Sequence, residues 1–130
     1  MASRRIAVAV VEDDSGMRQA LQRMLTVAGF DTRTFGSAEE FLEAGDVSRL
    51  DCLVADIRLP GLSGLELQQR LLESGRERPV IFITAHDTVD ARREADRLDA
   101  VAFLIKPFEG RLLVGAVNRA LTQGSQPGVS

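Results

Sequence analysis

The sequence predicts a doubly wound α/β fold, in which a five-stranded parallel sheet has helices on both faces. Apolar runs typical of buried strands alternate along the chain with segments in which apolar residues recur at helical spacing. Repeated strand–helix units favour a parallel sheet with right-handed crossovers. The length of 130 residues fits a single domain.

The first half of the chain supplies two of these units. Residues 6–11 form a valine-rich apolar run, typical of a strand that is covered on both faces. Apolar residues recur at helical spacing over residues 14–28, just before a glycine, which predicts a helix. Residues 30–35 alternate apolar and polar side chains, which indicates a short strand. A second helix is expected over residues 37–44, with its first residue, a serine, as the cap.

The second half supplies three more units. Its strands are near-continuous apolar runs, predicted at residues 53–56, 79–84 and 101–105. Its helices are predicted at residues 63–74, 87–98 and 109–121. The helix over 87–98 is the most charged segment and has only a thin apolar face. We expect the folded domain to cover residues 5–122, and residues 123–130, rich in Gly, Ser and Pro, to be a flexible tail or the start of a linker.

Composition narrows the class of protein. A net charge of -3 and a pI near 5.2 argue against direct nucleic-acid binding, which calls for a basic stripe. The single cysteine, Cys52, excludes an internal disulfide framework and favours the reducing cytoplasm. The short N-terminal apolar run ends in acidic residues, so no signal peptide is expected. No stretch is long and apolar enough to predict a membrane span.

Polar side chains follow four of the five predicted strands. Asp56 ends one strand, and a Pro-Gly turn follows it closely. The others are Glu12, Asp13 and Asp14 after the first strand, Thr84 and His86 after the fourth, and Lys106 after the fifth. Because the carboxyl ends of parallel strands share one edge, where open α/β sheets bind ligands, these groups should converge.

The chemistry that fits this set is phosphoryl transfer to a carboxylate. Clustered carboxylates repel one another unless a cation joins them, and oxygen ligands suit Mg²⁺. Asp56 would be the nucleophile, Lys106 would neutralise a phosphoryl oxygen, and Thr84 would donate a hydrogen bond to another. Each member alone has an ordinary explanation, since acidic residues commonly begin helices and a single Lys is commonly solvated.

The motifs that carry this chemistry resemble those of bacterial response-regulator receiver domains (CheY-like). The matching segments are Val-Glu-Asp-Asp at 11–14, Leu-Pro-Gly-Leu-Ser-Gly at 59–64, Ile-Thr-Ala-His at 83–86 and Phe-Leu-Ile-Lys-Pro-Phe at 103–108. The chain is most similar to receivers that precede a LuxR-type helix-turn-helix. The resemblance implies a flavodoxin-like sheet with strand order 2-1-3-4-5, and a phosphorelay receiver rather than an enzyme acting on a separate substrate.

The resemblance also implies roles for individual residues. Asp56 would accept a phosphoryl group from a histidine kinase. Mg²⁺ would be held by Asp13, Asp56, the backbone carbonyl of Arg58 and, through water, Glu12. Thr84 and Lys106 would contact the phosphoryl group.

The resemblance further implies a switch and a control surface. Thr84 and Phe103 would move together on phosphorylation, and the Lys106–Pro107 peptide is expected to be cis. The face formed by residues 87–121 would then change and control a homodimer, an output domain or a protein partner. As a hypothesis from position alone, Arg58 and His86, each two residues past a site residue, set the lifetime of the phosphoryl group.

The sequence departs from the family pattern at three positions. Glu12 stands where Asp is common, Asp99 stands where Gly is frequent before the last strand, and Ile105 replaces a frequently polar residue. Three alternatives stay open. They are a small aspartyl-phosphate phosphatase or phosphotransferase, a receiver that no longer accepts phosphate, and a fragment of a longer transcription factor. The first would need an acid two residues past the nucleophile, where Arg58 stands.

Overall fold

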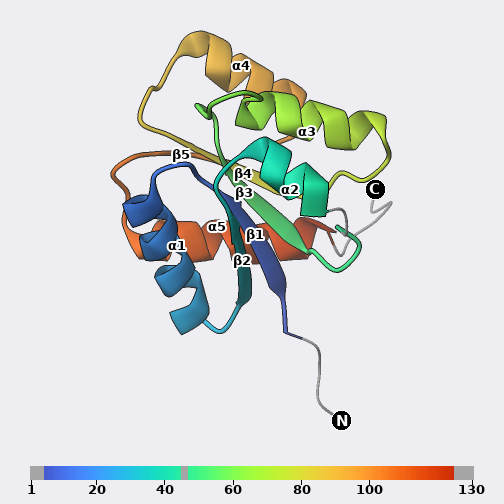
Figure 1. Cartoon of the computed structure of the whole chain (residues 1–130). Helices are drawn as coiled ribbons and strands as arrows, with labels where there is room; N and C mark the ends of the chain where they lie inside the picture. Colours follow the sequence, from blue (N-terminus) through green and yellow to red (C-terminus); the bar gives the residue numbers. More distant parts are fainter. Residues whose placement is uncertain (1–4, 45–46, 125–130) are drawn as a thin grey trace.

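The computed structural model describes residues 5–44 and 47–124, which form one parallel sheet between two layers of helices (Figure 1). The strands are β1 (Ala7–Val11), β2 (Asp31–Phe35), β3 (Cys52–Asp56), β4 (Val80–Thr84) and β5 (Ala102–Ile105). The helices are α1 (Ser15–Val27), α2 (Ala38–Ala44), α3 (Gly64–Glu73), α4 (Val89–Arg97) and α5 (Gly110–Gly124). The order β2-β1-β3-β4-β5 and the parallel pairing confirm the predicted fold class.

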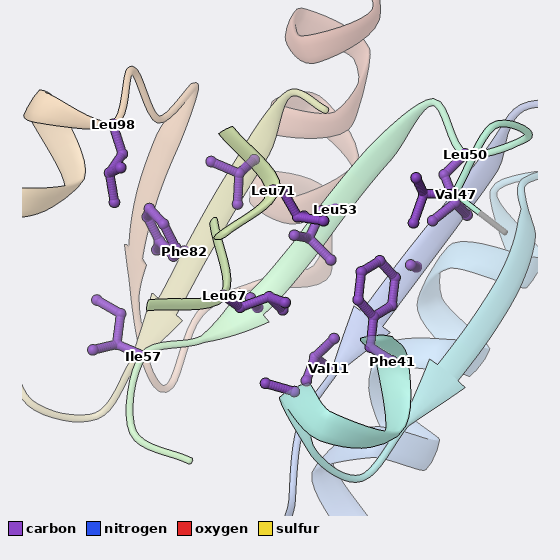
Figure 2. Packing of buried hydrophobic residues seen from close by; sticks show 14 of the residues in the cluster. Val11, Phe41, Val47, Leu50, Leu53, Ile57, Leu67, Leu71, Phe82 and Leu98 are labelled. Atoms are coloured by element: carbon purple, nitrogen blue, oxygen red, sulfur yellow. The ribbon is translucent and has the colours of Figure 1, made fainter. Parts of the chain in front are cut away.

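Two apolar cores hold the layers together, because successive side chains of a strand point to opposite faces of the sheet. On one face, Val8 and Val10 of β1 pack with Leu21 and Leu25 of α1 and with α5. On the other face, a second core joins alternate strand residues to α2, α3 and α4 (Figure 2). Its labelled members include Val11, Phe41, Leu53, Leu67, Phe82 and Leu98. Burial on both faces explains why β1, β3 and β4 are continuous apolar runs.

Short polar side chains fix where the helices begin. The Asp14 carboxylate accepts the N–H of Met17 at the start of α1, 2.9 Å away. Ser63 begins α3 with a reciprocal capping box, in which its hydroxyl and the Glu66 carboxylate each accept a backbone N–H. Thr88 caps α4, so this helix begins at Val89 and not at residue 87 as predicted.

The C-terminal helix also differs from its prediction. α5 continues to Gly124 instead of ending at Leu121, so the expected boundary at residue 122 falls inside the helix. In its last turn the Thr122 hydroxyl donates to the carbonyl of Asn118, four residues earlier in the same helix and 3.1 Å away. The rest of the predicted tail, residues 125–130, lies outside the described residues.

The strand register brings the polar strand ends to one edge. Val11 pairs with Ala55, so Glu12 and Asp56 both come one residue later on neighbouring strands. Asp56 in turn pairs with Ile83, the residue before Thr84. Beyond β5, the backbone N–H of Lys106 donates to the carbonyl of Thr84, 2.8 Å away.

Candidate functional site

Three carboxylates meet at this edge of the sheet. Glu12 and Asp13 follow β1, and Asp56 is the last residue of β3. Ligand oxygens of the three lie within 4.8 Å of one another. Glu12 and Asp56 are buried, with 1% and 5% of their surface exposed, while Asp13 is open to solvent. The cluster therefore has one exposed side through which a cation or a phosphodonor can approach.

Lys106 supplies the positive charge in the cluster. Its ammonium donates to Asp56 Oδ2 at 2.7 Å and to Glu12 Oε1 at 2.6 Å. Buried carboxylates are retained only with such partners, because desolvation of an unpaired charge is costly. Sequence reasoning placed Lys106 beside Asp56 but did not anticipate its bond to Glu12. Three carboxylates and one ammonium still leave negative charge for a further cation to offset.

Burial and ion pairing have opposite effects on the pKa values of Glu12 and Lys106. Burial raises the pKa of the Glu12 carboxyl above its usual value, and hydrogen bonds from Lys106 and from the Asp14 N–H offset only part of that rise. For Lys106, burial acts to lower the pKa. Its hydrogen bonds to Asp56 and Glu12 outweigh burial, so the pKa is raised and the ammonium stays charged.

Thr84 lies at the same edge, fully buried, and its hydroxyl is bonded to its own loop. The hydroxyl accepts the N–H of His86 at 3.0 Å and donates to the His86 carbonyl at 3.3 Å. The predicted site residue His86 thus meets Thr84 through its backbone, while its side chain is exposed. A Thr84 hydroxyl that turned toward a group on Asp56 would have to release both bonds.

The loop after Asp56 is held by contacts from three directions. The Arg58 N–H donates to Asp56 Oδ1 at 3.0 Å, and the Arg58 side chain is exposed. The Gly64 N–H donates to the carbonyl of Ile57 at 3.0 Å, which folds the loop back on itself. From α2, the Glu39 carboxylate accepts the N–H of Leu62 at 2.8 Å, which lowers the pKa of Glu39.

Sequence reasoning missed two of the residues that support the site, Glu39 and Arg18. The Arg18 guanidinium, one turn into α1, donates to the backbone carbonyls of Glu12 at 2.9 Å and Asp13 at 3.4 Å. A long cationic side chain near the start of a helix was the available signal for Arg18. Glu39 offered none, because its reach depends on where α2 lies.

Three further positions singled out in the sequence lie on β5 or next to its two ends. The Lys106–Pro107 peptide is cis. Asp99, which replaces the frequent Gly, has a φ of 58°, the left-handed conformation that Gly adopts most readily. Phe103 is partly buried on β5, beside Phe82 of β4.

The comparisons with known proteins decide the family. Residues 8–118 match the response regulator receiver domain. This chain belongs to that family. The receiver domain shares 42% identity over 116 residues with Nodulation protein W of Bradyrhizobium diazoefficiens, covering 89% of this chain and 51% of the relative. It shares 39% identity over 114 residues with the transcriptional regulatory protein FixJ of the same organism, covering 88% of this chain and 56% of FixJ.

The solved structures agree. The crystal structure of FixJ-N superposes with a TM-score of 0.82 at 35% identity, covering 92% of this chain and 96% of that one. The receiver domain spans about half the length of the curated relatives it matches. In residues 5–44 and 47–124, none of the helices has the length and apolar character that crossing a bilayer requires.

Proposed function

We propose that this receiver domain accepts a phosphoryl group on Asp56 from a histidine kinase and passes the signal to an output domain or a protein partner in transcription regulation. The observation that carries the proposal is the contact of Lys106 with both Asp56 and Glu12. These groups belong to a cluster in which negative charges outnumber positive ones and which is open to solvent at Asp13. One of the relatives named above, FixJ, is a transcriptional regulatory protein, which supports this output. We place the domain in the cytoplasm, where a kinase and a transcription target would be reached.

The residues present fit Mg²⁺, because every candidate ligand is a carboxylate or carbonyl oxygen. Asp13, Asp56 and the backbone carbonyl of Arg58 would hold the ion, and Glu12 would contribute through water. When bound, Mg²⁺ would supply positive charge that offsets the charge of the phosphoryl oxygens.

The chain's own groups would do the transfer. An Asp56 carboxylate oxygen forms a bond to phosphorus while the bond from phosphorus to the donor imidazole nitrogen breaks, and the nitrogen keeps the electron pair. The Lys106 ammonium then donates to a phosphoryl oxygen, which now carries the negative charge. The Thr84 hydroxyl turns to donate to another phosphoryl oxygen. Phe103 then turns into the space that Thr84 leaves, and the α4–β5–α5 face changes.

Intact mass spectrometry tests the proposal. Incubation with acetyl phosphate and Mg²⁺ should add one phosphoryl group to the protein, and EDTA should prevent the addition. Asp56→Asn should abolish it, whereas Asp51→Asn, which removes a carboxylate at the opposite end of β3, should leave it unchanged. An adduct that forms equally in Asp56→Asn, or no adduct in the wild type, would reject Asp56 as the acceptor.

The same samples address lifetime and output. We propose that Arg58 and His86 set the rate at which the phosphoryl group is lost, since each lies two residues past a site residue. Longer or shorter half-lives in Arg58→Ala or His86→Ala are expected, and unchanged half-lives in both refute this role. Size-exclusion with light scattering, with and without beryllofluoride and Mg²⁺, checks whether the output includes a homodimer.

A further inference from the structure

Arg92 of α4 touches two elements that the switch would move. Its guanidinium donates two hydrogen bonds to the Asp87 carboxylate in a fork-like geometry, with Nε–Oδ1 at 2.6 Å and Nη2–Oδ2 at 3.2 Å. The central carbon of this guanidinium, Cζ, lies 4.8 Å from the centre of the Phe103 ring on β5. These three distances correspond to two contacts, a bidentate ion pair and a cation–π stack.

These contacts complete a continuous path from Thr84 to Phe103. The Thr84 hydroxyl is held by both backbone groups of His86, and Asp87 is the next residue in the chain. Asp87 positions Arg92, and Arg92 covers the ring of Phe103. The path runs through the loop between β4 and α4, on the side of the sheet where Phe103 packs against the core.

The planar fork makes Arg92 suited to this position. A guanidinium can stack on a ring and bind a carboxylate edge-on at the same time, which an ammonium cannot do. Pairing with Asp87 fixes one side-chain arrangement for Arg92 although half of its side chain is exposed. The hydrogen bond from Arg92 also lowers the pKa of Asp87.

We infer that Arg92, positioned by Asp87, is a latch that holds Phe103 in its unphosphorylated arrangement and couples it to Thr84. This inference rests on the proposed function. When the Thr84 hydroxyl leaves His86 for a phosphoryl oxygen, the adjoining Asp87 shifts, the fork on Arg92 opens and Phe103 is released. The latch therefore stabilises the inactive arrangement only, and its loss shifts the population toward the active one.

The test measures the affinity of the whole chain for beryllofluoride in the presence of Mg²⁺. Arg92→Ala is expected to bind beryllofluoride about three- to tenfold more tightly than wild type, the scale of one exposed ion pair plus one cation–π contact. Asp87→Asn should shift the affinity the same way. The double variant should gain no more than the larger single change, because the two residues act as one unit.

A matched variant and a spectroscopic readout separate the latch from a general effect on α4. Arg93→Ala removes the same charge one residue further along α4 and should leave the affinity unchanged. In protein labelled with fluorophenylalanine, the Phe103 ¹⁹F resonance of Arg92→Ala without ligand should lie closer to its beryllofluoride-bound position. Arg92→Lys, which keeps the charge without the fork, should restore the wild-type affinity only in part.

The outcomes distinguish the two proposals. If wild type binds no beryllofluoride with Mg²⁺, the proposed function fails. If wild type binds it but Arg92→Ala matches Arg93→Ala in affinity and the Phe103 resonance does not move, the phosphorylation site stands and the latch is refuted.

Discussion

At the residue scale, the position of the proposed phosphoacceptor depends on a residue without a side chain. A Cβ built on Gly64 would lie 2.3 Å from the carbonyl oxygen and 3.0 Å from the carbonyl carbon of Asp56. It would also lie 3.3 Å from the Cα of Ile57. These neighbours are backbone atoms of a buried strand end, so they cannot move aside without displacing Asp56. Gly64 allows α3 to begin directly against the site.

Gly64→Ala is expected to destabilise the domain by about 1–3 kcal/mol, the usual cost of overpacking, and to slow phosphorylation of Asp56. Urea unfolding measures the first effect and the rate of mass gain with acetyl phosphate the second. Gly115→Ala is the control, because a Cβ there meets nothing within 4 Å in an exposed part of α5. It should stabilise the helix by about 0.5–1 kcal/mol. Equal stability of the two variants would contradict the close-packing argument.

Some contacts of the site residues could be predicted from the sequence, and others could not. The convergence of Glu12, Asp56 and Lys106 was predictable, because strand ends in a parallel sheet share an edge whatever the helices do. Contacts made from helices were not predictable in the same way. Glu39 reaches the loop before α3, and Arg92 reaches Phe103, only because α2 and α4 lie at particular places over the sheet. Apolar periodicity predicts which face of a helix packs against the sheet, but not where over the sheet the helix lies.

At the element scale, α4 stands out for how little it buries. Within its bounds Ala95 is the one buried residue, although Leu98 just beyond is buried too. Much of its organisation comes from exposed polar contacts, such as Arg97 with Glu94 at 2.8 Å. Few apolar contacts make an element easy to displace, which suits the helix next to the proposed switch. The turn that ends α4 places Asp99 in the left-handed region.

Asp99→Gly should therefore stabilise the domain by about 0.5–1 kcal/mol, because Gly avoids the steric cost that an L side chain has at positive φ. The variant Arg93→Gly, at the exposed middle of α4, should instead destabilise it by about 0.5–1 kcal/mol, since Gly weakens helix interiors. Thermal or urea unfolding of both variants checks the opposite signs. Stabilisation by both, or by neither, would show that backbone conformation at Asp99 is not the controlling factor.

The elements themselves were all predicted, and the errors lie at their ends. α4 begins two residues later than expected because the Thr88 hydroxyl caps it, while Asp87 is engaged by Arg92. The prediction ended α5 at Leu121, the last residue of the apolar pattern, whereas the helix runs on to Gly124. Helix ends depend on single hydrogen bonds and caps, which several nearby residues can supply equally well in a sequence.

At the scale of the whole molecule, the fold follows from burial of the central strands on both faces. β1, β3 and β4 are buried along their whole length, and the outer strands are less so. That pattern appears in the sequence as continuous apolar runs, which is why the parallel sheet was predictable. Cys52 begins β3, the middle strand of the sheet, and none of its surface is exposed. Its thiol thus reports on the integrity of the whole core.

Burial, aided by the nearby charge of Asp51, raises the pKa of the Cys52 thiol to about 12 from an ordinary value of 9.0. Because the folded pKa is the higher one, the thiol's contribution to stability is complete below the unfolded pKa and is lost as pH rises toward the folded one. The free-energy advantage of wild type over Cys52→Ala in urea unfolding should therefore shrink by about 1 kcal/mol between about pH 7 and about pH 10. Thiol reagents should label native protein only at the rate at which the core opens, and labelling should quicken in urea. Comparison with Cys52→Ala cancels the titration of the single lysine, Lys106, so an advantage that stays constant over this range would show that the native thiol ionises as freely as the unfolded one.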